Sequence, residues 1–188
     1  MIIIIIYNMN WQKIGLTKFP GRFTVYKKGN IIYKKTNTNN NNTSNSFRKK
    51  ITVDFNNYKM IMTNAWKYKY NHTVPIYHIE RDGSHKSIYI DGFRLDKIGS
   101  HLNSIKNKKK RLKYASLVKK AVIKLKKSIN ENYNKIGGDW ALHNLIYSIK
   151  YDKIFNIDVE GFYTYQKLPH WGTINHINNW LYSVIKIL

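Results

Sequence analysis

The sequence has no cysteine, and acidic residues are scarce in it. The lack of cysteine excludes disulfide bonds, zinc ribbons and thiol catalysis. Ten Asp and Glu residues stand against 33 Lys and Arg among 188 residues, which gives a formal net charge of +23. Self-repulsion at that charge opposes a compact free state, and a bound polyanion relieves it. The charge balance therefore favours RNA, DNA or an anionic membrane as the partner.

Apolar runs long enough to cross a bilayer are also missing, since a spanning helix needs about 20 residues. The apolar residues 1–7 (MIIIIIY) are too few, and Lys, Asn or His interrupts every later window of that length. The N-terminus is neither Arg- and Ser-rich, as a mitochondrial presequence is, nor basic before its apolar run. We therefore expect a protein that is not integral to a membrane. We expect it to lie in the mitochondrial matrix and to be encoded in the organelle, because a protein made there needs no presequence.

Arginine and alanine are rare, at five and four residues, whereas Ile, Lys, Asn and Tyr make up about half of the chain. Codons for these four amino acids carry only A or T at their first two positions, so the composition indicates an AT-rich genome. That bias explains the preference for Lys over Arg. It does not explain the excess of bases over acids, because AT-rich DNA encodes Asn, Ile and Tyr as readily as Lys. We attribute the composition to an organellar genome and the charge to function; an AT-rich nuclear genome is the alternative.

Alternating apolar residues and turn signals predict the N-terminal organisation. Residues 22–35 predict a β-hairpin around Gly29-Asn30, with Phe23 and Tyr33 among its alternating apolar positions. The polar run 36–46 predicts an Asn-rich linker. We therefore expect three parts: an N-terminal extension with a hairpin (1–35), the linker (36–46), and an RNA-binding domain that ends in a helix (47–188).

The main domain is expected to be α+β, or α/β layered, with short strands and a long helix. Its predicted elements are strands at 51–55 and 60–63, a hairpin of 74–79 with 86–90 across Asp82-Gly83, a helix at 110–130, a second helix at 140–149 capped by Asp139, a strand at 154–159, an aromatic loop at 162–171 and a helix at 174–188. Residues 110–130 place apolar side chains at spacings of three and four and lysines elsewhere, which indicates an amphipathic helix.

Basic residues cluster where nucleic acid would bind. A run precedes and enters the predicted helix 110–130, and we interpret it as a dense, flexible set of phosphate contacts; a solvated loop is the alternative. Aromatic rings interleave with lysines at 66–70 and 162–171, where unpaired bases could stack; core packing is the alternative. The residues expected to bind RNA on these grounds are Arg48, Lys49, Lys50, Lys67, Lys69, Lys106, Lys108, Lys109, Lys110, Arg111, Lys113, Lys119, Lys120, Lys167, His170 and Trp171.

Signals of catalysis are weak. The seven histidines show no metal-ligand spacing, and no phosphate-binding glycine loop occurs. A nuclease needs clustered carboxylates to hold metal ions, and only Asp158 and Glu160 are spaced to share a strand face. We therefore expect no catalytic residues, no metal, no cofactor and no small-molecule substrate. An intron-encoded nuclease or maturase and a subunit of a respiratory membrane complex remain the alternatives.

Several short motifs resemble the small-subunit ribosomal protein eleven family. Residues 73–83 resemble its strand hairpin, 110–115 (KRLKYA) its basic approach to a long helix, 137–139 its glycine turn, and 169–172 (PHWG) its late loop. The glycine turn is shorter here, and apolar residues 174–188 replace the family's basic tail. The chain is also similar to mitochondrially encoded ribosomal proteins of AT-rich protists such as ciliates. The resemblance implies ribosomal RNA and neighbouring ribosomal proteins as partners, and it adds Gly137 and Gly138 to the expected RNA contacts.

Overall fold

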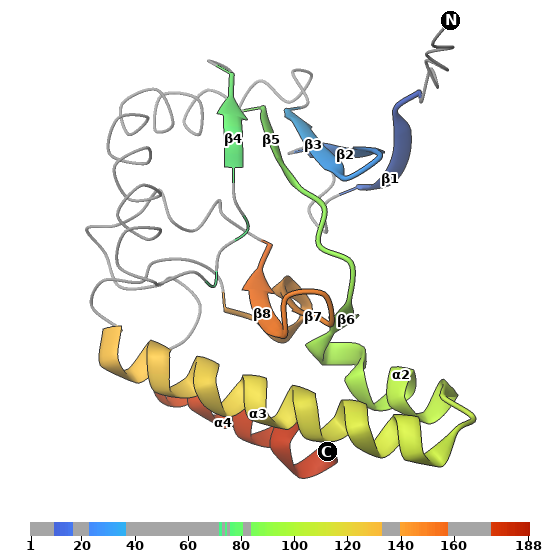
Figure 1. The fold of residues 1–188 in the computed structure, drawn as a ribbon. Coiled ribbons are helices and arrows are strands. Elements are labelled where there is room, and N and C mark those ends of the chain that lie inside the picture. The colour runs from blue at the N-terminus through green and yellow to red at the C-terminus, as the bar shows by residue number, and fades with distance from the viewer. Residues whose placement is uncertain are drawn as a thin grey trace, which may run out of the picture. The chain divides into compact units, whose positions relative to one another are not determined.

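Two antiparallel sheets and a set of helices make up the computed structural model, which confirms the expected α+β class (Figure 1). The structure describes residues 10–16, 23–36, 72, 74, 76–80, 84–132, 140–157 and 174–188. Contacts divide the chain into two units. Unit 1 comprises Met1–Phe55 and Pro75–Tyr89, and unit 2 comprises Asn56–Val74 and Ile90–Leu188. This division differs from the expected one, because residues 75–89 group with the N-terminal hairpin.

Unit 1 is built on a five-stranded sheet in the order β1-β2-β3-β5-β4. Its strands are β1 (Gln12–Leu16), β2 (Phe23–Lys28), β3 (Ile31–Thr36), β4 (Ile76–Ile79) and β5 (His85–Ile88). The predicted hairpin of β2 and β3 is confirmed, and Gly29 supplies the positive φ of 55° that its two-residue turn requires. The antiparallel pair of β4 and β5 is confirmed too. Strand β1 was not predicted.

Unit 2 combines a three-stranded sheet, in the order β6-β7-β8, with helices. Its elements are β6 (Phe93–Arg94), a 3-10 turn (Leu95–Lys97), α2 (Ile98–Ser104), α3 (Lys108–Asn132), a second 3-10 turn (Leu142–Asn144), β7 (Leu145–Ser148), β8 (Lys153–Asn156) and α4 (Ile174–Ile187). The predictions of α3, β8 and α4 are confirmed. Helix α2 was not predicted.

The prediction of a helix at 140–149 is wrong. These residues form a 3-10 turn and then strand β7, which pairs with β6 on one side and β8 on the other. Leu145 and Tyr147 are fully buried while Ile146 between them is partly exposed, which is the alternation of a strand, and Ser148 at the end of the strand is buried as well. Pairing on both edges satisfies the backbone groups of β7, and the ten-residue segment is too short for helical propensity to compete.

The core of unit 2 lies along one stripe of α3. The predicted inward positions Val118, Val122 and Leu125 are completely buried, and Ala121 and Ile129 nearly so. Helix α3 contacts β8, α2 and α4, which places its stripe against the sheet and against other helices. Because one side of the helix is held in this way, its opposite side is fixed toward solvent.

Helix α4 runs antiparallel to α3 (Figure 1). Asn178 near the start of α4 donates a 3.0 Å hydrogen bond to the side chain of Asn130 near the end of α3. Leu181 and Val184 are buried as predicted, but Trp180 and Ile185 are only partly buried and Ile177 takes an inward position instead. None of the helices in the part of the chain that the structure describes is both long and apolar enough to cross a membrane.

Several predicted segments lie outside the described residues. They are the linker 36–46 except for Thr36, which ends β3, the strands at 51–55 and 60–63, the Asp82-Gly83 turn, the glycine turn at 137–139 and the aromatic loop at 162–171.

Candidate nucleic-acid interface

The first turn of α3 concentrates positive charge at a capped helix end. The side chain of Asn107 accepts a 2.9 Å hydrogen bond from the backbone N–H of Lys110, and its carbonyl accepts one from Arg111. This is the geometry of an Asn N-cap, a residue type that helices prefer there. The run from Lys108 is therefore helical, which corrects the expectation that it is a flexible approach to the helix.

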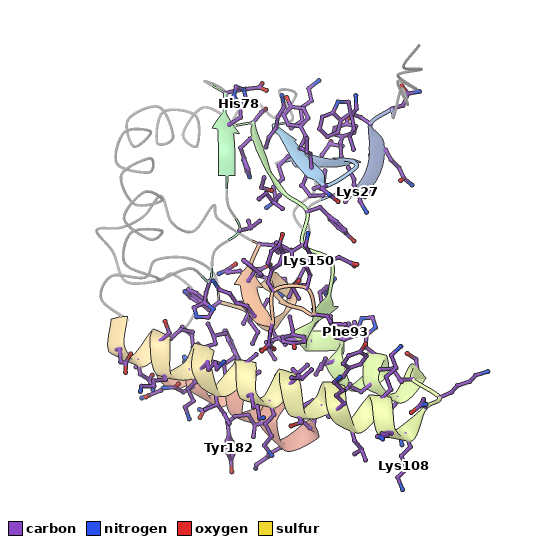
Figure 2. All side chains as sticks on the ribbon, viewed as in Figure 1. Lys27, His78, Phe93, Lys108, Lys150 and Tyr182 are labelled. Atoms are coloured by element: carbon purple, nitrogen blue, oxygen red, sulfur yellow. The ribbon has the colours of Figure 1, made fainter. Side chains whose placement is uncertain are left out.

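Positive residues at this helix end are unfavourable without an anion. The helix dipole places partial positive charge at the N-terminus and favours acidic side chains there. The first turn of α3 has no acidic residue and begins with three lysines, Lys108–Lys110. All three are exposed, and Lys108 points away from the rest of unit 2 (Figure 2). A bound anion would therefore compensate the charges of both the dipole and the side chains.

Lysines continue along the solvent face of the helix. Lys113, Lys120 and Lys127 recur at seven-residue intervals, which places them on one side of the helix. Lys109, Lys119 and Lys124 are exposed beside this row. Over its 25 residues α3 carries ten basic side chains and one acidic one, Glu131. The row spans roughly 20 Å from Lys113 to Lys127 at 1.5 Å per residue, long enough to contact several phosphates.

The single acidic residue does little to neutralise this face. Glu131 lies 3.8 Å from Lys127 as an i,i+4 pair, and both side chains are largely exposed. Exposed pairs of this kind contribute little free energy and are screened by salt. The remaining cations of the α3 face are left to interact with a partner or with solution counterions.

An aromatic cluster anchors the beginning of α3 to β6 and α2. The Phe93 ring lies 5.9 Å from that of Tyr114 and 5.4 Å from that of His101, centroid to centroid. Lys110 Nζ lies 5.8 Å from the Tyr114 ring centroid. Figure 2 shows Phe93 between these elements. The packing of these rings therefore fixes the position of the basic first turn of α3.

Two other basic side chains of unit 2 are held by neighbouring residues, Arg94 at the surface and Lys153 half-buried. Arg94 donates two hydrogen bonds to the carboxylate of Asp96, which lowers the pKa of that carboxyl. Lys153 is half-buried, and this desolvation lowers its pKa to about 8. Its Nζ lies 5.2 Å from the centroid of the Phe155 ring. These two cations interact with residues in or beside the sheet and do not belong to the exposed basic side of α3.

Acidic and histidine side chains in the described ranges do not gather into a metal site. No group of three His, Cys, Asp or Glu in these ranges could hold a metal ion. His72 hydrogen bonds through Nδ1 to the Ile154 carbonyl at 2.9 Å, and its burial lowers its pKa. Asp152 accepts a hydrogen bond from Tyr147, so its position also has a structural explanation.

The structure brings together eight of the residues expected to bind RNA. Lys106 precedes the capping residue Asn107, and the other seven lie on α3: Lys108, Lys109, Lys110, Arg111, Lys113, Lys119 and Lys120. Arg111 is only partly exposed, whereas the other seven are exposed. Lys124 and Lys127 belong to the same exposed face but were not among the expected residues; their spacings of four and seven residues from Lys120 were the available signal.

Ten expected residues lie outside the described ranges and keep the status of predictions. They are Arg48, Lys49, Lys50, Lys67, Lys69, Gly137, Gly138, Lys167, His170 and Trp171.

The sequence matches no protein-family model and no curated protein.

Proposed function

We propose that this protein is a non-catalytic structural constituent of a mitochondrial ribosome, encoded in the organelle, and that it binds ribosomal RNA of the small subunit through the exposed face of α3. The observation that carries the proposal is the ratio of ten basic residues to one acidic residue on a helix whose opposite side is buried. Burial of the apolar stripe fixes the orientation of the lysines. A fixed row of cations matches the backbone of a structured RNA.

Electrostatics favours a nucleic acid over a small anion as the partner. Each phosphate that a lysine contacts releases counterions, so the affinity grows with the number of contacts. A single phosphate could engage the first turn of α3 but would leave Lys120, Lys124 and Lys127 unoccupied. Only an extended polyanion can contact the whole row at once.

The choice of ribosomal RNA over DNA rests on the sequence. The AT-rich composition indicates an organellar gene, and the motifs at 110–115 and 137–139 resemble those of a small-subunit ribosomal family. A ribosomal protein also needs no catalytic group, since its role is to neutralise and hold the folded RNA. The same composition would suit an organellar nuclease, so the test has to separate these two activities.

Sedimentation of the native protein in a mitochondrial lysate tests the proposal. In moderate salt with magnesium, we expect the protein to migrate with the small ribosomal subunit and to lose that position after RNase treatment. Migration with membrane complexes, or as a free protein, regardless of RNase would overturn the proposal. Metal-dependent cleavage of duplex DNA by the purified protein would overturn its non-catalytic part.

A charge-neutral variant tests the role of α3 in the purified protein. The variant Lys113→Gln, Lys120→Gln, Lys124→Gln removes three exposed charges and keeps side chains of good helix propensity. We refer to it as the α3 glutamine variant. Its matched control is Lys97→Gln, Lys150→Gln, Lys186→Gln, which removes the same charge from exposed positions of unit 2 outside α3. The α3 glutamine variant should bind structured RNA more weakly than this control.

A further inference from the structure

Unit 1 carries a second surface on which aromatic rings and lysines alternate. Strands β2 and β3 place Tyr26 directly opposite Tyr33, and β1 places Lys13 opposite Tyr26. Strand β5 places Lys86 opposite Tyr33. Residues paired in this way project from the same side of a sheet. This surface is the aromatic face, defined by Trp11, Lys13, Tyr26, Tyr33 and Lys86.

Ring positions confirm that these side chains lie together. The Trp11 and Tyr33 centroids are 5.7 Å apart, and those of Tyr26 and Tyr33 are 6.3 Å apart. Lys86 Nζ lies 5.6 Å from the Tyr33 centroid. Trp11 is 40% exposed although tryptophan is usually well buried in a folded domain. The rings are tilted by 51° and 30° rather than stacked face to face, so they do not cover one another completely.

Charge on this sheet has one dominant sign. The described residues of unit 1 include six lysines, Lys13, Lys27, Lys28, Lys34, Lys35 and Lys86, and one acidic residue, Glu80. Glu80 accepts a 3.2 Å hydrogen bond from the Tyr33 hydroxyl, so its carboxylate fixes the position of that end of the ring. The two-residue period of the strands puts Lys28 and Lys35 on the aromatic face with Lys13 and Lys86. The surface therefore combines flat apolar rings with surrounding cations.

We propose that the aromatic face binds unpaired RNA, with bases stacked on Trp11 and Tyr26 and the backbone contacted by Lys13 and Lys86. Aromatic rings amid lysines suit single strands because the two faces of an unpaired base are free to stack. Bases of a duplex are already stacked, so the rings offer a duplex no comparable contact. This inference rests on the proposed function and gives unit 1 a specificity that the α3 face lacks.

Cross-strand packing accounts for part of the cluster. A Tyr–Tyr pair directly opposite in an antiparallel sheet stabilises the sheet, and Tyr33 is additionally held by Glu80. Packing of this kind does not require the partly exposed Trp11 beside the edge strand, nor lysines on four neighbouring strands. Trp11 is therefore the residue whose replacement separates binding from folding.

Binding of the purified full-length protein to two RNA probes tests the inference. The probes are a single-stranded oligouridine and an RNA duplex, each about 10 nucleotides long, within the usual site size of a stacking platform. Trp11→Leu removes the ring but keeps an apolar side chain, and Trp11→Phe keeps a ring. We expect Trp11→Leu to weaken oligouridine binding by roughly five-fold or more. Trp11→Phe should stay within about two-fold of the wild type, and duplex binding should change in neither variant.

The matched control is a ring on the opposite side of the same sheet. Tyr89 lies under Lys27, whose Nζ is 3.6 Å from the ring centroid, and Tyr89→Leu should leave oligouridine binding within about two-fold. Circular dichroism and thermal melting of each variant verify that the sheet is folded. Ultraviolet crosslinking of oligouridine to the wild type supplies a measurement that needs no variant, and we expect it to label the peptide containing Trp11 or Tyr26.

Each outcome bears on the inference. Unchanged oligouridine binding by folded Trp11→Leu, or a crosslink that maps only to α3, would overturn it. If the α3 glutamine variant still weakens RNA binding in that case, the proposed function stands without the aromatic face. If the wild type binds neither probe and does not sediment with ribosomes, the proposed function fails as well.

Discussion

The hydroxyl of Tyr147, on the buried strand β7, donates a 2.8 Å hydrogen bond to Oδ1 of Asp152 in the turn that follows. Asp152 adopts a positive φ of 45°, which is uncommon for a residue other than glycine. Burial and the neighbouring carboxylate together raise the pKa of the Tyr147 hydroxyl. One aspartate thus sets the turn geometry and satisfies a buried donor.

Replacement of Asp152 should show how much these two contributions are worth together. Asp152→Ala removes the acceptor and places alanine in the left-handed region, so we expect it to lower the free energy of unfolding by about 2–3 kcal/mol. Asp152→Asn keeps an acceptor and a residue that tolerates this φ, so the loss should be below about 1 kcal/mol. Urea unfolding of the two variants makes the comparison. Equal losses would show that neither the hydrogen bond nor the φ matters.

Gly92 is predicted to tolerate no side chain. A Cβ atom there would lie 2.0 Å from the backbone oxygen of Tyr147, where β6 meets β7. A clash of backbone with side chain cannot relax cheaply, so Gly92→Ala should cost about 3 kcal/mol of stability. Gly99→Ala is the control, because its Cβ would meet only the Ile187 side chain at 3.2 Å and alanine favours a helix. Thermal melting should show a large fall for the first variant and a small change for the second.

Salt dependence of RNA binding should report the contacts of α3. If Lys113, Lys120 and Lys124 each contact a phosphate, the α3 glutamine variant loses three contacts. The slope of log K against log salt concentration should then become shallower by about two to three. The matched control at Lys97, Lys150 and Lys186 should keep the slope of the wild type. The same slope for both variants would mean that the charge acts through the whole protein rather than through α3.

Lys153 should make the stability of unit 2 depend on alkaline pH. Its pKa is lowered to about 8 in the folded protein from 10.5, so the unfolded chain holds the extra proton between these values. The contribution of Lys153 therefore raises the free energy of unfolding as the pH increases from about 8 to 10.5. Below pH 8 the half-buried side chain is charged in the folded protein, and this charge opposes folding. Lys153→Met should therefore stabilise the protein at pH 7 by roughly 1 kcal/mol, a value discounted for partial exposure.

The difference between Lys153→Met and the wild type should shrink as the pH approaches 10.5, while groups common to both proteins cancel. Denaturant unfolding at several pH values measures this difference. Lys150→Met, at an exposed position in the same hairpin, is the control and should show no comparable trend. A constant advantage for Lys153→Met from pH 7 to pH 10 would contradict the assignment.

Elements with a strong local pattern could be predicted from the sequence. The β2–β3 hairpin follows from Gly29-Asn30 between alternating apolar residues, because only a few residue pairs suit such a turn. Helix α3 follows from its apolar stripe, whose members Val118, Val122 and Leu125 have no exposed surface. Lys119 and Lys120 were found for the same reason, since the apolar period also fixes the solvent side, whereas the five basic residues from Lys108 to Lys113 were found from their density in the sequence.

Elements that depend on distant partners could not be predicted in this way. Strand β7 is short, and its identity comes from pairing with β6 some fifty residues earlier. Helix α2 contains Gly99 and Asn103, which are poor helix formers, and buries Ile98 and Leu102 in the shared core. The aromatic face was missed because Trp11, Tyr33 and Lys86 are far apart in sequence, and they meet only through the pairing of β1 with β2, of β2 with β3 and of β3 with β5.

The position of α4 has a consequence for the order of synthesis. Ile177, Leu181 and Val184 of α4 share the core with the apolar stripe of α3, which emerges from the translating ribosome about fifty residues earlier. At roughly 5–20 residues per second, that stripe waits several seconds for its last partner. During this interval the apolar stripe of α3 in the nascent chain is exposed to solvent beside the row of lysines. Unit 2 thus completes its core only after nearly all of it has been translated. An early contact with RNA would shield the lysines while the apolar stripe of α3 is still exposed.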